Sequence, residues 1–303
     1  MSPLITIIIP IFNREHLIKE TLDAVLKQTY KNWECILIDD GSVDASVKIA
    51  KEYANSDNRF KVLQRSERRR KGAATCRNIG IENSNGSYIQ FLDSDDLLES
   101  NKLESQISKL NKSDNYTLST CKWGRLDKGM EHPKKYEKLP IYKDFKNPSH
   151  LLKIFGTKET FFPVHCYLTP IQLINKAGKW NEELTINDDG EYFSRVLLKA
   201  EQIIFDDHTY AIYRSGSGNR LSQTETNEQI RQYIKSWNSI DESIQMALET
   251  KNHTYIIHAK TLLYYKIKNT HPELISEYSQ FFKNRRSFIE NMFFKIINRI
   301  QRS

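Results

Sequence analysis

Three carboxylates follow a short apolar run in the first third of the sequence. The run at residues 88–92 ends directly in Asp93-Ser94-Asp95-Asp96. Carboxylates crowded at the end of a buried strand repel one another and lose hydration, which is costly unless something neutralises them. Carboxylate oxygens are the ligands that Mg²⁺ and Mn²⁺ prefer. The spacing predicts a divalent-metal site made by Asp93 and Asp95, and the alternative is a solvated turn in which Asp95 or Asp96 caps the next helix.

Two other acidic pairs occur at comparable places along the chain. Asp39-Asp40 follows an apolar run at residues 33–38, and Asp188-Asp189 opens a segment with helical periodicity. Acidic residues at a helix start are also stabilised by the helix dipole, so simple capping is an alternative for the second pair.

Apolar strands alternate with amphipathic helices over the first hundred residues. This order predicts a doubly wound α/β fold with a mainly parallel sheet, in which ligands collect at the carboxyl ends of the strands. Pro10 is expected to end the pairing of the first strand, and Asn13 to cap the first helix. The expected strands are residues 4–11, 33–38, 60–63, 88–92, 116–122, 203–206 and 210–213. The expected helices are residues 14–28, 45–54, 73–83, 102–110 and 171–177, with a lid-like excursion at residues 128–148.

Composition excludes several classes of protein. The 303 residues carry a formal net charge of +7, which fits an acidic ligand, but the charge is spread along the chain and no nucleic-acid recognition motif occurs, so no nucleic-acid partner is expected. No G-x-G-x-x-G follows the first strand, and no P-loop motif occurs. Four widely spaced cysteines, the short apolar run at the N-terminus and the lack of a long apolar run predict a cytoplasmic protein, either free or peripheral on the inner face of a membrane.

Five short motifs, in their order and spacing, make the chain resemble the family 2 inverting glycosyltransferases of the GT-A fold. The resemblance covers about residues 4–220, and the helical pattern beyond residue 228 lies outside it. It implies a GT-A catalytic domain at residues 1–225 and a helical extension at residues 226–303. The motifs are Pro10-Ile11-Phe12-Asn13, Asp39-Asp40-Gly41-Ser42 with Asp44, Arg77-Asn78-Ile79-Gly80, Phe91 to Asp96, and Asp188-Asp189 to Arg195.

The resemblance also assigns roles within these motifs. Residues at the positions of Pro10, Phe12 and Asp40 line the nucleotide base and ribose in the family. In the family, the residue at the position of Asp95 binds the metal on the donor diphosphate, together with the residue at the position of Asp93. The remaining residues expected at the donor are Asn13, Arg77 and Ser94 from the motifs, with Lys71 and Arg214 as the cations.

The family's Glu-Asp pair corresponds to Asp188-Asp189. Asp189 is therefore the expected catalytic base, which takes the proton of the attacking hydroxyl, and Asp188 is the reserve. Lys71 ends the charged run 67–71, for which a solvated loop is the alternative. Arg220 is a further candidate for the diphosphate. His165 is expected either near the acceptor or as a hydrogen-bonded core residue, and His208 at the surface.

These observations predict a metal-dependent inverting glycosyltransferase that uses Mn²⁺ or Mg²⁺. The resemblance implies a nucleotide-sugar donor, with UDP preferred, and an acceptor that is a saccharide or a lipid-linked saccharide of surface glycan biosynthesis. The rival hypotheses are a sugar-phosphate nucleotidyltransferase and a non-catalytic module that binds a sugar nucleotide or a polysaccharide.

The end of the chain alternates aromatic and basic residues from Phe281 onward, as basic amphipathic helices do. One interpretation is peripheral contact of the C-terminal helices with an anionic membrane. The other is that the apolar face packs on the catalytic domain or on a second subunit in a homo-oligomer.

Overall fold

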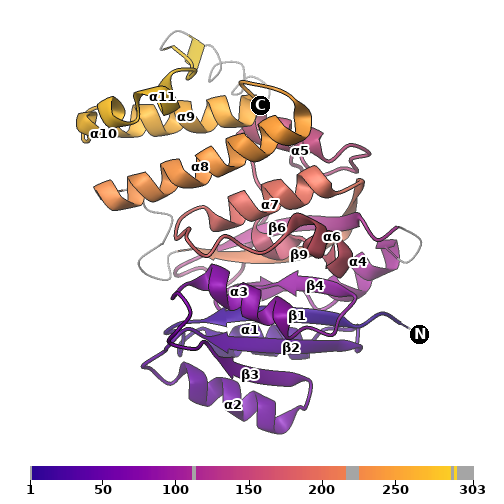
Figure 1. Ribbon diagram of the computed structural model, residues 1–303. Coiled ribbons are helices and arrows are strands. Elements are labelled where there is room, and N and C mark those ends of the chain that lie inside the picture. Colours follow the sequence, from indigo (N-terminus) through magenta and orange to yellow (C-terminus); the bar gives the residue numbers. More distant parts are fainter. Residues whose placement is uncertain (1, 111–113, 216–224, 288–289, 292–303) are drawn as a thin grey trace.

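The computed structural model describes residues 2–110, 114–215, 225–287 and 290–291 (Figure 1). Its larger sheet has the strand order β3-β2-β1-β4-β8, and β8 alone runs antiparallel to its neighbour. Strands β1 and β2 are buried on both faces, as expected of central parallel strands covered by helices. The strands are β1 (Ile5–Ile11), β2 (Trp33–Asp39), β3 (Phe60–Gln64), β4 (Tyr88–Phe91) and β8 (Thr169–Pro170).

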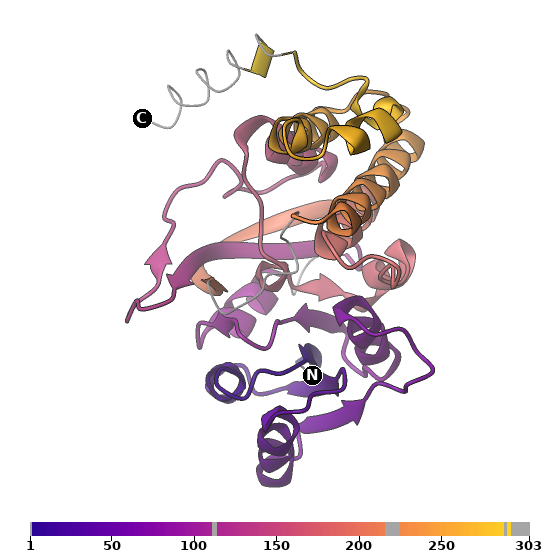
Figure 2. The ribbon, with the colours of Figure 1, turned by 90° about the vertical axis from the view of Figure 1, so that its left-hand side faces the viewer.

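Helices cover both faces of this sheet. Helices α1 (Ile18–Leu26) and α2 (Ser46–Ser56) pack against each other on one face, and α3 (Ala73–Glu82) covers β1 and β2 from the other (Figures 1 and 2). The prediction of a doubly wound, mainly parallel α/β fold is therefore confirmed. Helices α4 (Lys102–Leu110) and α6 (Ile171–Ala177) have the predicted bounds, and Gly178 ends α6 at φ +85°.

The smaller sheet has the order β5-β9-β6-β7. Its members are β5 (Leu97–Leu98), β6 (Thr117–Asp127), β7 (Lys134–Lys135) and β9 (Gln202–Ser215). The prediction of two strands at 203–206 and 210–213 was wrong, because β9 is one strand that bulges: Cys121 lies opposite Asp206, and the next residue of β6 lies opposite Tyr210. The excursion 128–148 is anchored, since Phe145 is buried and pairs with Ile203.

Two expectations about the end of β1 were also wrong. Pairing with β2 continues through Pro10 to Ile11, whose carbonyl accepts a hydrogen bond from Asp40 at 2.9 Å. Proline is tolerated because the pairing of β1 with β4 has already ended at Ile8. Asn13 does not cap α1: it takes a left-handed backbone at φ +50°, and its Oδ1 accepts from the Val43 amide at 2.9 Å.

The helical extension packs on the rest of the chain. Thr226 caps α8 (Asn227–Leu248) with a reciprocal capping box, and α8 lies against α7 (Asp188–Lys199). Helix α9 (Thr254–Ile267) lies against α5 (Ser149–Lys158), which the sequence analysis missed. At Gly156 a Cβ would stand 2.5 Å from the Tyr255 backbone, so this contact needs glycine.

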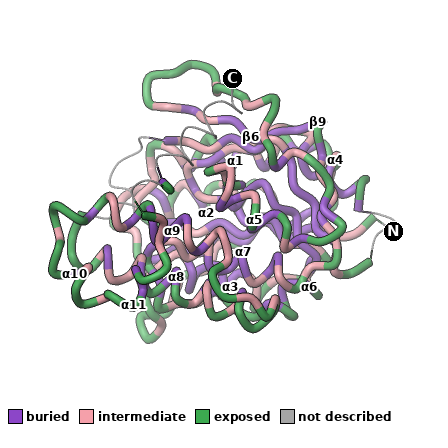
Figure 3. The backbone as a smooth tube through the Cα atoms, turned by 90° about the horizontal axis from the view of Figure 1, so that it is seen from above, coloured by how far each residue is buried: buried purple, intermediate pink, exposed green. Residues whose placement is uncertain are grey.

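The apolar residues of these helices therefore join the same core as the sheets. In Figure 3 buried positions recur along α8 and α9, and their buried apolar side chains belong to the large core cluster. Two short helices, α10 (Pro272–Glu277) and α11 (Ser279–Phe282), follow, and Phe281 and Phe282 are buried. The division of the chain at residue 225 remains a prediction.

Candidate active site

The carboxyl ends of β1, β2 and β4 lie at one edge of the larger sheet, and Figure 2 looks onto this edge. The acidic motif leaves β4 there. The contact of Arg214 with Asp95 brings the end of β9 to the same edge, and the contact of Arg77 with Asp188 brings the start of α7 there. Five segments that are far apart in the sequence thus meet in one place.

Arg77 is at the centre of the arrangement. Its side chain, only 5% exposed, projects from α3 and donates from Nη2 to Asp93 Oδ1 at 2.7 Å and from Nη1 to Asp188 Oδ2 at 2.9 Å. The guanidinium also lies 4.4 Å from the centre of the Trp180 ring. Burial disfavours the cation, but Asp93 and Asp188 outweigh burial and raise the pKa of Arg77.

Asp188 and Asp189 open helix α7 and differ in their partners. Asp188 is held by Arg77, whereas Asp189 is exposed and its Oδ1 accepts from the Gly190 amide at 2.8 Å. Loss of hydration among the surrounding protein atoms, and then the charge of Asp188, raises the pKa of Asp189 to about 6. The pKa of Asp188 is also raised by burial, although Arg77 acts against this shift. A carboxylate with a raised pKa that is open to solvent can accept a proton near neutral pH.

Asp95 faces a second set of cations. Its Oδ2 lies 3.4 Å from Arg14 Nε, and its backbone carbonyl accepts from Arg214 Nε at 2.8 Å. Arg214 also donates to Glu20 at 2.6 Å. The sequence analysis placed Arg214 near the donor diphosphate, and the structure brings it next to the acidic motif.

The donor set of the acidic motif fits a divalent cation. Asp93 and Asp95 supply hard oxygens, and their side chains are 37% and 17% exposed, so solvent reaches each of them. Ser94, between them, is buried. The metal site at Asp93 and Asp95 remains a prediction.

The residues expected to line the base and ribose lie at the carboxyl ends of β1 and β2. Lys71 Nζ lies 3.7 Å from the centre of the half-exposed Phe12 ring. Lys71, the residue of the run 67–71 that the sequence analysis selected, therefore faces Phe12. Arg69, in contrast, pairs with Glu82 and Glu182.

Asp40 is buried, and its Oδ1 accepts from Arg65 Nε. The sequence analysis missed Arg65. A sequence signal was present, because Arg65 directly follows the strand β3. In the structure the Arg65 amide donates to the Asp39 carbonyl at 2.9 Å, at the same edge of the sheet. Pro10 lies in β1, and Asn13 links the loops that follow β1 and β2 through the Val43 amide.

The two histidines of interest have different surroundings. His165 is fully buried with its Nδ1 3.0 Å from Asp96 Oδ2, so of the two interpretations the core residue is the one observed. Burial raises the pKa of Asp96 to about 6, although His165 acts in the opposite direction. His208 is exposed as expected, and Arg220 lies outside the described residues.

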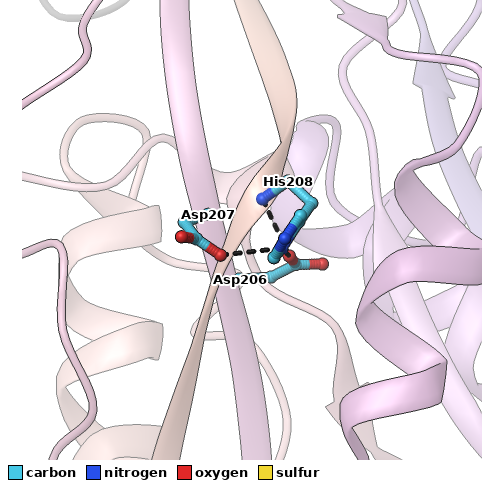
Figure 4. Close-up of side chains that lie close together, drawn as sticks. All are labelled: Asp206, Asp207 and His208. Atoms are coloured by element: carbon cyan, nitrogen blue, oxygen red, sulfur yellow. Dashed lines mark hydrogen bonds and ion pairs between the residues drawn. The ribbon is translucent and has the colours of Figure 1, made fainter.

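His208 lies beside Asp206 and Asp207 at the bulge of β9 (Figure 4). Each of these residues offers one atom that could bind a metal, and the three atoms lie within 4.8 Å of one another. Among the described residues, these three form the group of His, Cys, Asp or Glu side chains with that spacing. All three residues are consecutive, so the grouping is a property of the local turn. His208 Nδ1 pairs with Asp207 Oδ1 at 2.7 Å.

Comparison with known proteins assigns the class. The sequence model of Glycosyl transferase family 2 matches residues 6–177. Glycosyltransferase GlyG of Streptococcus pneumoniae is 30% identical over 238 residues, which is 72% of this chain and 73% of the relative. The chain belongs to glycosyl transferase family 2. It is a glycosyltransferase enzyme of glycan biosynthesis, so the nucleotidyltransferase and binding-module hypotheses are disfavoured.

A shorter match and two solved structures add detail about relatives. An Escherichia coli enzyme, UDP-Glc:alpha-D-GlcNAc-diphosphoundecaprenol beta-1,3-glucosyltransferase WfgD, is 44% identical over 110 residues, 36% of this chain and 42% of the relative. The S. aureus TarS 1-349 complex with UDP-GlcNAc aligns with a TM-score of 0.68 at 19% identity, covering 90% of this chain and 75% of the TarS 1-349 chain. The mannosyltransferase PcManGT of Pyrobaculum calidifontis, in complex with GDP-Man and Mn2+, aligns with a TM-score of 0.56 at 17% identity, covering 87% and 70%. These likenesses show the GT-A fold.

Proposed function

We propose that this enzyme is a metal-dependent inverting glycosyltransferase that moves a sugar from a UDP-linked donor to a saccharide or lipid-linked saccharide. The observation that carries the proposal is the contact set of Arg77. It ties Asp93 of the acidic motif to Asp188, next to the exposed carboxylate of Asp189. Donor and acceptor chemistry can therefore meet in one place.

The donor nucleotide binds at the ends of β1, β2 and β3. Phe12 and Lys71 offer a ring face and a cation that contact each other, and Asp40, held by Arg65, supplies an acceptor. UDP is preferred because TarS was solved with UDP-GlcNAc and WfgD is named as a UDP-Glc enzyme. A lipid-linked acceptor is proposed because the name of WfgD gives a diphosphoundecaprenol-linked one.

Asp189 acts as the base. Asp188 is engaged by Arg77, so Asp189 is the carboxylate of the pair that can accept the proton of the acceptor hydroxyl as its oxygen attacks the anomeric carbon. Attack opposite to the departing diphosphate inverts the anomeric centre. A divalent ion held by Asp93 and Asp95 would stabilise the charge that develops on the diphosphate. Arg14 and Arg214 lie beside Asp95 and add positive charge there.

The proposal is tested by donor turnover. The wild type is incubated with UDP-glucose, UDP-GlcNAc, UDP-galactose and GDP-mannose, each with Mn²⁺ and a panel of mono- and disaccharide acceptors and lipid-diphosphate saccharides. We expect one UDP-sugar to be turned over to UDP and a β-linked product, as judged by NMR coupling constants. Asp189→Asn should lower kcat by about 10² to 10⁴ while still binding UDP. Turnover by Asp189→Asn at the wild-type rate, with Asp188→Asn inactive, would assign the base to Asp188 instead.

The proposal also includes a cytoplasmic location with peripheral membrane contact through the C-terminal helices. In the described residues no helix is both long enough and apolar enough to cross a bilayer. Phe281 and Phe282 pack inward, so membrane contact rests on the residues after 287, most of which lie outside the description. Flotation with anionic vesicles should be lost on truncation after Ser287, and equal flotation would instead favour internal packing. Size-exclusion chromatography with light scattering of both forms tests the alternative of a homo-oligomer.

A further inference from the structure

We propose that the buried pair Asp96–His165 is a positioning device that holds Arg214 beside the metal-binding motif. This inference rests on the proposed function, because it assigns Arg214 to the donor diphosphate. Neither Asp96 nor His165 touches the substrates in this scheme. Both act through Arg214.

The two carboxylate oxygens of Asp96 contact two different elements. Oδ1 accepts from the Arg214 backbone amide at 2.7 Å, and Oδ2 faces His165 Nδ1 at 3.0 Å. Asp96 is 1% exposed and His165 is fully buried, so neither group can exchange these contacts for water. The last carboxylate of the acidic motif is therefore turned inward, away from the two that fit a metal.

The contact from Asp96 sets the position of Arg214 at the end of β9. Asp96 fixes the backbone of Arg214, while the side chain of Arg214 reaches back to the Asp95 carbonyl at 2.8 Å and to Glu20 at 2.6 Å. Tyr213, the preceding residue, lies nearly parallel to the His165 ring, at 12° and 6.5 Å between centroids. The backbone of Arg214 is thus held by Asp96 and its guanidinium by Asp95, so neighbouring residues of the acidic motif position both.

His165 is itself held from behind. Its carbonyl accepts from Gln90 Nε2 at 3.1 Å, and Gln90 Oε1 accepts from the fully buried Lys102. Lys102 belongs to α4 and Gln90 to β4, so the short helix η1 (Val164–Cys166) that carries His165 is fixed to the central sheet. Because His165 is held rigidly, Asp96 is held as well. Its hydrogen bond from the Arg214 amide then fixes the end of β9.

A double-mutant cycle on UDP binding tests the inference. Binding of UDP with Mn²⁺ is measured by calorimetry for the wild type, His165→Phe, Arg214→Ala and the double variant. Phenylalanine keeps a ring against Tyr213 but removes the imidazole nitrogen that lies 3.0 Å from Asp96 Oδ2. We expect His165→Phe to weaken binding about tenfold in the wild-type background and less than about twofold when Arg214→Ala is already present, as coupled residues do. Equal factors in both backgrounds would overturn the proposal, because a general loss of stability does not depend on the Arg214 guanidinium.

Two further variants guard against misfolding. His165→Gln retains an N–H that can reach Asp96 and should recover part of the affinity lost in His165→Phe. Asp96→Asn keeps the shape, leaves no buried charge unpaired, and should weaken UDP binding in the same direction as His165→Phe. Wild-type affinity in Asp96→Asn and in His165→Phe, with Arg214→Ala impaired, would overturn the inference and leave the proposed function intact. Failure of the wild type to bind UDP or GDP with Mn²⁺ would instead overturn the proposed function, and the inference with it.

Discussion

Arg77 and Asp188 form a hydrogen-bonded ion pair of 2.9 Å between α3 and the start of α7. The same guanidinium holds Asp93, so one buried cation links the acidic motif to the proposed catalytic pair. It neutralises part of the charge that would otherwise drive these carboxylates apart. The site is thereby held together before any donor binds.

The first prediction concerns this cation. Arg77→Met should lower the free energy of unfolding by about 3 kcal/mol, since removing one partner of a buried ion pair leaves uncompensated charge. Urea unfolding followed by circular dichroism measures the change. Arg68→Met is the matched control, because Arg68 is exposed in the charged run, and it should change stability by less than about 0.5 kcal/mol. Equal losses in both variants would mean that Arg77 does not stabilise the site.

The second prediction concerns pH. The pKa of Asp189 is raised to about 6, and a base works only when deprotonated, so kcat/KM should be constant at higher pH and fall as the pH drops through about 6. Asp188 contributes to that shift, so Asp188→Asn removes a negative neighbour and should move the acid limb to lower pH. Asp207→Asn, an exposed carboxylate, is the control and should leave the limb in place. An acid limb that stays fixed in Asp188→Asn would contradict the coupling of the two carboxylates.

The third prediction concerns Lys71. Its ammonium lies over the Phe12 ring, at the expected nucleotide pocket. Lys71→Gln should weaken UDP binding about tenfold at low salt, equivalent to about 1.4 kcal/mol, and reduce the salt dependence of binding because one cation is lost. Calorimetry at two ionic strengths measures both effects. Lys48→Gln, an exposed lysine of α2, should behave as the wild type. The assignment of Lys71 fails if both variants bind UDP equally well.

The fourth prediction concerns the metal. UDP with Mn²⁺ at about a hundred times its dissociation constant adds about 2.7 kcal/mol, which raises the unfolding midpoint by several degrees. EDTA or Asp95→Ala should remove most of that rise, because Asp95 is a proposed ligand. His208→Ala is the matched control, since it alters the other group of ligand-type residues while leaving the acidic motif intact. Loss of the effect in His208→Ala with retention in Asp95→Ala would move the metal to the bulge of β9.

Residues with local signals were found from the sequence. The apolar runs predicted β1 and β2, and the periodicity of 102–110 gave the bounds of α4, because burial on both faces and the helical repeat are properties of neighbouring residues. The motifs also located Arg77, Asp93 and Asp188 as members of one site. Local signals failed for β9, where three residues bulge out of a strand that long-range pairing with β6 keeps continuous.

The amino-acid sequence by itself determined the class of fold and the family, and it predicted which residues bind the nucleotide, the metal and the proton. The tertiary structure decided how these residues are paired. Arg77 selects Asp188, Arg65 selects Asp40, and Asp96 turns inward to His165, over separations of 111, 25 and 69 residues. Such choices depend on which side chains share a buried space and must neutralise one another there, and spacing along the chain carries no record of that.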